Sequence, residues 1–177
     1  LKEDYLDPLL LLGHLYANFN DMDESKKAYE RYLACQNAYD AARETENIIL
    51  THLDSRVTAW YNLGLIAQMQ ADREAARRWF DRVVEISPYH ADVNLHLGRL
   101  ALDGGELAGA EAYFRKHLEQ HDDSASAHVG LARVRMQRGA YADAEAHLQA
   151  ALEIEPDQAG ALLHLGRLYL DTERPAE

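Results

Sequence analysis

The 177-residue sequence is poor in residues that interrupt helices or cross-link chains, with four prolines, ten glycines and one cysteine. The single cysteine, Cys35, excludes an intramolecular disulfide and any metal cluster built on several thiolates. The longest apolar run, Leu9 to Leu12, is far shorter than the 18 residues that indicate a membrane-spanning helix. We therefore expect no membrane insertion.

Positive charge is also scarce, since 18 Lys and Arg residues stand against 30 Asp and Glu residues, for a net charge of −12. Nucleic-acid binding requires a positive surface, so we expect no nucleic-acid partner. The content of 47% hydrophobic and 27% charged residues is typical of a folded chain. Ala, Leu, Glu and Arg dominate, and this composition favours helices.

Signatures of catalysis are missing, because no Ser-His-Asp or Cys-His motif and no Gly-rich phosphate loop occurs. Of the nine histidines, His117 and His121 lie one helical turn apart but lack a third ligand at a diagnostic spacing. His96 and His164 each stand two residues before a repeated glycine, so they recur with the fold. We predict no enzyme activity, no catalytic residue, no cofactor and no metal site.

A repeat of 34 residues organises most of the chain: Leu63-Gly64, Leu97-Gly98, Leu131-Ala132 and Leu165-Gly166. A small residue follows 12 positions after the glycine position, a large apolar residue 16 positions after it and a helix-ending residue 24 positions after it. These are, in turn, Ala76, Ala110 and Ala144; Phe80, Phe114 and Leu148; and Pro88, Asp122 and Pro156. The pattern resembles the tetratricopeptide repeat over roughly residues 57–177, and more loosely before them.

Each repeat predicts two amphipathic helices of about 13 residues. Short turns join them around Ala71, Gly104-Gly105 and Gly139. A glycine inside a helix is tolerated where two helices approach closely, and a lone hairpin cannot bury its apolar face without stacked neighbours. The resemblance implies an all-α, right-handed superhelical solenoid of about ten helices.

The chain divides into two segments. Residues 57–177 form an in-register array of three full repeats plus the first helix of a fourth. Residues 1–56 are irregular, because Gly13 precedes Gly64 by 51 residues, one period plus 17. We predict three helices here, over 7–19, 23–36 and 38–53, with a single helix over 24–53 as the alternative. This segment is also a candidate surface for self-association.

The resemblance implies that the first helices of the hairpins line a concave groove that receives a peptide or a partner helix. In three repeats an arginine directly follows the glycine position: Arg99, Arg133 and Arg167. Apolar and aromatic residues occupy the neighbouring groove positions: Tyr61, Leu95, Val129 and Leu163 three before it, and Leu102 and Met136 four past it.

Such a strip suits an acidic segment with apolar anchors, because arginine binds carboxylates bidentately. A competing interpretation is that Arg99 and Arg167 pair with Asp103 and Asp171 along their own helices. Arg133 has only Gln137 at that spacing, so we expect it to be the least satisfied of the three. Some adaptors of this family hold chaperone carboxyl termini with Lys and Asn, and that pattern is missing here.

We therefore predict a protein–protein interaction scaffold or adaptor that binds a protein or peptide partner, of acidic and apolar character, in the groove. One alternative is a regulatory or assembly arm of a larger enzyme or of a secretion or polysaccharide-export machine. The other is a self-assembling scaffold that associates through residues 1–56. The sequence gives no indication of the compartment or of the partner's identity.

Overall fold

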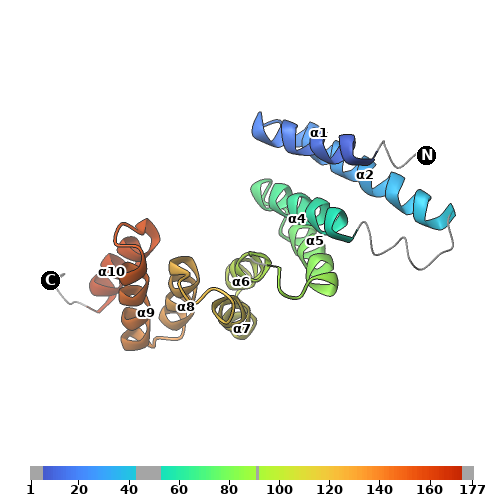
Figure 1. Cartoon of the computed structure of the whole chain (residues 1–177). Helices are drawn as coiled ribbons and strands as arrows, with labels where there is room; N and C mark the ends of the chain where they lie inside the picture. Colours follow the sequence, from blue (N-terminus) through green and yellow to red (C-terminus); the bar gives the residue numbers. More distant parts are fainter. Residues whose placement is uncertain (1–5, 43–52, 91, 173–177) are drawn as a thin grey trace. The chain divides into compact units, whose positions relative to one another are not determined.

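The computed structural model describes residues 6–42, 53–90 and 92–172. Within these ranges the chain is all-α and has no strand, which confirms the predicted fold class (Figure 1). The helices are α1 (Leu6–Asn18), α2 (Met22–Ala42), α4 (Leu53–Met69), α5 (Arg73–Ile86), α6 (Val93–Asp103), α7 (Leu107–Leu118), α8 (Ala125–Gln137), α9 (Tyr141–Ile154) and α10 (Ala159–Asp171). The nine described helices are close to the predicted number of about ten.

Consecutive helices pack as hairpins, α1 with α2, α4 with α5, α6 with α7 and α8 with α9. Each hairpin turns through one residue with a left-handed backbone: Asn20, Ala71, Gly105 and Gly139. Each of these residues lies seven positions after the repeated glycine position. Glycine adopts this conformation without strain, whereas a non-glycine residue such as Ala71 carries a steric cost. The predicted turns around Ala71, Gly104-Gly105 and Gly139 are thus confirmed.

In three hairpins the repeated glycine packs directly against an aromatic ring from the second helix of the same hairpin. A β-carbon added at Gly98 would lie 2.6 Å from the Phe114 ring, and one added at Gly13 would lie 2.6 Å from the Tyr29 ring. Gly130 of α8 approaches Phe114 from the next hairpin, where an added β-carbon would lie 2.5 Å from the ring. Phe114 is fully buried in consequence.

In the hairpin of α8 and α9, alanine replaces the repeated glycine, and the side chain that packs against it is smaller than an aromatic ring. Ala132 is buried, and the residue 16 positions later is Leu148, which packs in the same apolar cluster. The loss of ring volume therefore compensates for the added methyl group, as volume-conserving exchanges do in packed cores.

The helices form two compact units, Leu1–Pro88 and Tyr89–Glu177. The core of the first unit joins α2 to α4 through Tyr29, Tyr32, Leu33, Ala59, Leu63 and Ile66. In the second unit, one cluster of apolar side chains connects α6, α7 and α8, and another connects α8, α9 and α10. Within each unit, stacking of neighbouring hairpins makes the core continuous, as expected for helical repeats.

The N-terminal segment differs in one respect from the predicted three helices. The sequence predicts a break between residues 36 and 38, but α2 runs without interruption from Met22 to Ala42. No glycine or proline occurs in this stretch to end the helix. Residues 43–52 lie outside the described residues, so both the third helix and the alternative single helix over 24–53 stay predictions.

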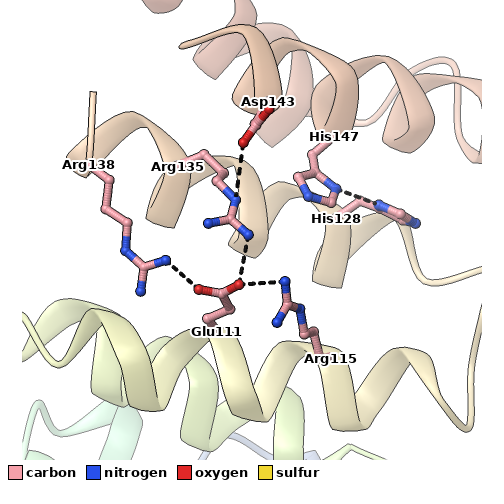
Figure 2. A network of polar contacts seen from close by, with 7 residues as sticks. All are labelled: Glu111, Arg115, His128, Arg135, Arg138, Asp143 and His147. Atoms are coloured by element: carbon pink, nitrogen blue, oxygen red, sulfur yellow. Dashed lines mark hydrogen bonds and ion pairs between the residues drawn. The ribbon is translucent and has the colours of Figure 1, made fainter. Parts of the chain in front are cut away.

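A buried carboxylate holds the second and third hairpins of the array together (Figure 2). The Glu111 side chain of α7 is only 12% exposed and forms ion pairs with Arg115 of its own helix and Arg135 of α8, both at 2.7 Å, and with Arg138. Burial alone raises the pKa of Glu111, but the hydrogen bond from Arg138 and the charges of Arg135 and Arg115 outweigh it, so this pKa lies below its usual value.

The same region contains a histidine pair that links α8 to α9. The Nδ1 atoms of His128 and His147 lie 3.3 Å apart. Burial lowers the pKa of both side chains, and for His147 the nearby His128 and Arg135 lower it further. Both imidazoles are therefore neutral at pH 7, and one ring can donate a hydrogen bond to the other.

None of the helices in the described part of the chain is long and apolar enough to cross a membrane.

The contact between ring and glycine predicts that glycine-to-alanine substitutions at two equivalent positions change the free energy of unfolding in opposite directions. Gly98→Ala forces the Phe114 ring aside, and we expect it to lower the free energy of unfolding by about 1–3 kcal/mol. Gly166→Ala in α10 meets no atom within 4 Å and should raise that free energy by up to about 1 kcal/mol through helix propensity. Urea denaturation followed by circular dichroism measures both, and equal effects would contradict this interpretation.

The Glu111 cluster predicts a large effect from removal of one charge. Glu111→Gln removes the carboxylate that three guanidinium groups share, and among the described residues only Arg135 keeps another, Asp143 at 3.9 Å. We expect the free energy of unfolding to fall by about 2–3 kcal/mol. The matched control is Glu119→Gln at the exposed end of the same helix, where a change within about 0.5 kcal/mol is expected. Equal stability of the two variants would show that the cluster adds nothing.

Candidate functional site

Two adjoining hollows lie on the first helices of the hairpins in the second unit. The central hollow, of about 220 Å³, is lined by residues of α6, α8 and α10 and of the turn before α10: Arg99, Ser126, Val129, Gly130, Arg133, Gln158, Gly160 and His164. The C-terminal hollow, of about 320 Å³, is lined by Arg133, Met136, Gln137, Tyr141, His164, Arg167 and Asp171. Because Arg133 and His164 line both, we treat the two hollows as one feature, the arginine groove.

All three arginines of the predicted ladder line this groove. The repeat explains their placement, since helices α6, α8 and α10 present equivalent positions to the same side of successive hairpins. The guanidinium group of arginine is not deprotonated in proteins, so three positive charges line the groove although the net charge of the chain is −12.

The ion pairs of the ladder differ in part from the expected ones. Arg167 does pair with Asp171 along α10, at 3.7 Å, and its side chain is 71% exposed. The expectation that Arg133 is the least satisfied arginine is wrong, because it bonds to Asp103 of the preceding hairpin at 3.1 Å. Spacing within one helix cannot reveal this bond, since it forms only when α6 and α8 pack together.

The predicted apolar residues of the groove are distributed between the surface and the core. Val129 and Met136 line the hollows. Leu95 and Leu102 instead pack in the core, with 9% and 2% of their surfaces exposed. Leu163 is 69% exposed but lines neither hollow. Tyr61 belongs to the first unit, where its ring centroid lies 6.0 Å from that of Phe80.

His164 is one of the groove residues that the sequence did not predict. Its position two residues before Gly166 indicates only a recurring place in the repeat, shared with His96. In the structure it lines both hollows, together with Arg133. Burial lowers the pKa of His164, and the positive charges of Arg133 and Arg167 lower it further.

Tyr141, Ser126 and Gln158 also line the groove and complete its polar surface. They come from the start of α9, from α8 and from the N-cap of α10. Tyr141 and Ser126 carry hydroxyl groups, and the Gln158 amide caps α10, because its Oε1 accepts a hydrogen bond from the Gly160 N–H at 2.9 Å.

Metal coordination has no support among the described residues. No three His, Cys, Asp or Glu side chains gather there in a way that would hold an ion. The His117 and His121 rings lie 5.0 Å apart, and the Nε2 atom of His117 is 3.0 Å from the Ser124 hydroxyl. His117 is buried, so a structural hydrogen bond accounts for its place.

Solved structures with the same fold include proteins of several kinds. YrrB, a tetratricopeptide protein with an unusual peptide-binding site, is 17% identical, with a TM-score of 0.70 over 94% of this chain and 77% of YrrB. PilW, a type IV pilus biogenesis factor, is 20% identical, with a TM-score of 0.74 over 96% of this chain and 70% of PilW. The O-GlcNAc transferase of Thermobaculum terrenum is 26% identical over 66% of this chain, with a TM-score of 0.63, and the match spans 22% of that enzyme.

No curated protein matches the sequence. Family profiles described as tetratricopeptide repeat match residues 67–134, 102–157 and 135–177, and a second such profile matches residues 6–43. Together they cover more than half of the 177 residues. The chain therefore belongs to the tetratricopeptide repeat family, whose fold is a scaffold for protein–protein interaction.

Proposed function

We propose that this protein is an adaptor that binds a peptide segment in the arginine groove, and that the segment carries carboxylates between apolar side chains. The observation that carries the proposal is the convergence of Arg99, Arg133 and Arg167 on two adjoining hollows. Guanidinium groups bind carboxylates through paired, charge-assisted hydrogen bonds.

The apolar part of the proposed ligand follows from the groove walls. Val129 and Met136 lie beside the arginines, so a ligand side chain that contacts them leaves water while its neighbouring carboxylate meets a guanidinium. Methionine adapts its shape to different apolar partners, which suits a recognition surface. The peptide-binding site of YrrB supports a peptide ligand for this fold.

The existing ion pairs determine which arginine a ligand carboxylate can bind most easily. Asp103 and Asp171 hold Arg133 and Arg167, and the Arg167 pair is the weaker of the two, since it is longer and more exposed. A ligand carboxylate therefore competes with Asp171 at a small cost and gains a second positive charge from Arg133.

A second candidate is a self-assembling scaffold. Three large apolar side chains of the first helix and the turn after it, Leu11, Leu15 and Phe19, are 66%, 49% and 75% exposed. They recur every four residues, which places them on one side of the helix. A stripe of this kind is suited to contact with another chain.

A third candidate is a repeat arm of a larger enzyme or of a secretion machine. Tetratricopeptide folds are in general non-catalytic, yet the similarity to part of an O-GlcNAc transferase and to PilW supports such a context. The adaptor function in the groove is compatible with it.

Binding of a defined peptide tests the adaptor function. The probe is a short fluorescent peptide in which glutamates alternate with leucines, and the comparison peptide has glutamine in place of every glutamate. We expect Arg167→Ala to weaken binding of the acidic probe by about tenfold, the effect of losing about 1.4 kcal/mol of charge-assisted bonding. Fluorescence anisotropy measures the dissociation constants.

The matched control for this prediction is Arg78→Ala, an exposed arginine of α5 that also faces a carboxylate one turn away, at 3.9 Å. It should leave binding unchanged. Equal affinity for the acidic and the glutamine peptide, or equal loss in both variants, would sink the proposed groove.

Light scattering tests the self-assembly candidate. We expect the wild-type chain to form dimers or larger species as concentration rises, and the double variant Leu11→Ser, Phe19→Ser to remain monomeric, because the exposed apolar stripe is then interrupted. A wild-type chain that stays monomeric at high concentration rules this candidate out.

A further inference from the structure

His164 occupies the junction of the arginine groove. It lies on α10 and lines both the central and the C-terminal hollow, a position shared with Arg133 alone. Its side chain is half-buried, so it is neither a packed core residue nor a freely solvated one. A ligand that spans the two hollows passes over it.

The charged groups around His164 are predominantly positive. Arg133 faces the groove from α8, Arg167 from α10 itself and Arg99 from α6. Two carboxylates counter these charges, since Asp171 is paired with Arg167 and Asp103 of α6 with Arg133. Tyr141 of α9 lines the C-terminal hollow. Of the α9 carboxylates, Glu145 accepts a hydrogen bond from the Tyr169 hydroxyl at 3.0 Å, and Asp143 lies 3.9 Å from Arg135.

This surrounding favours the neutral imidazole in the empty groove. The two arginines and partial burial lower the pKa of His164 below its ordinary value of 6.5, so at pH 7 it carries no charge. A carboxylate placed between Arg133 and Arg167 offsets their charge and supplies an acceptor for an imidazolium proton. The charged form of His164 then becomes more favourable in the complex than in the free protein.

We propose that His164 is a ligand-contacting residue of the arginine groove and that it takes up a proton when a carboxylate-bearing ligand binds. The inference rests on the proposed function, since it concerns the regulation of the same site. Binding and protonation are reciprocally linked, so whatever favours the imidazolium also tightens the complex.

The sign of the pH dependence follows directly. Between the lower pKa of the free protein and the higher pKa of the complex, the complex holds more protons, so affinity increases as pH falls. One proton taken up corresponds at most to about tenfold tighter binding per pH unit. Above the pKa of the complex, His164 is neutral in both states and affinity no longer depends on its protonation.

Calorimetric titration of the alternating leucine–glutamate peptide tests the inference. At pH 6 and above the peptide carboxylates stay ionised, because their ordinary pKa is about 4.3. Heats measured in buffers of different ionisation enthalpy give the number of protons bound with the peptide. We expect net uptake by the wild-type protein at pH 6, and binding about three- to tenfold tighter at pH 6 than at pH 8.

His164→Gln should abolish this uptake and flatten the pH profile, so that the ratio of its affinities at pH 6 and pH 8 falls to about one. His121→Gln is the control, since His121 lines neither hollow, and should behave as the wild type. Arg167→Gln gives a second readout: it removes one repelling charge from free His164, so the uptake should decrease.

The outcomes separate the two claims. Peptide binding without proton uptake, or uptake that survives His164→Gln, overturns this inference and leaves the proposed function standing. Failure of the peptide to bind at any pH between 5.5 and 8 overturns the proposed function and the inference with it.

Discussion

The contact of an aromatic ring with a helical glycine is the constraint on which the rest of this structure depends. In each of three hairpins the ring of Tyr29, Phe80 or Phe114 lies against a glycine of the preceding helix, where even one methyl group would clash. Glycine weakens a helix by about 1 kcal/mol relative to alanine, so its presence needs a packing reason. Here the close approach of two helices buries a complete ring.

This contact also determines how successive hairpins pack and where the groove forms. Phe114 touches Gly98 of its own hairpin and Gly130 of the next, so one ring fixes the spacing of α6, α7 and α8. The remaining side of α6, α8 and α10 then presents Arg99, Arg133 and Arg167. The small residues that permit the packing and the arginines that line the groove recur with the same period, which couples scaffold and site.

Two sets of arginines in the second unit have different surroundings. Arg115, Arg135 and Arg138 surround the carboxylate of Glu111 and join α7 to α8 (Figure 2). Arg167 of the groove has a weaker internal pair, with Asp171 at 3.7 Å, and its side chain is 71% exposed. A charge that is held by several buried bonds stabilises the fold, whereas one with a single exposed pair remains available to a ligand. The net charge of −12 gives no indication of the positive charges that line the arginine groove.

Much of the fold was predictable, because a repeat displays its spacing directly in the residues. The 34-residue period predicted the hairpins, the turns and the close approach of helices at the glycines, and the ladder of arginines came from the same period. The N-terminal helix boundary was not predictable in this way. The pattern around Asn37 resembles a hairpin turn, yet α2 continues to Ala42 because nothing in this stretch ends a helix.

The sequence by itself determined the family, the helical repeat and the residues that recur on each face of it. Only the tertiary structure decided what those residues do, because their partners come from neighbouring hairpins. Packing of α6 against α8 gave Arg133 its bond to Asp103, and it buried Leu95 and Leu102. Packing of α8 against α10 brought His164 beside Arg133, at the junction of two hollows. Spacing along one helix fixes which side a residue faces, but its charge environment depends on side chains that lie about one repeat away in the sequence.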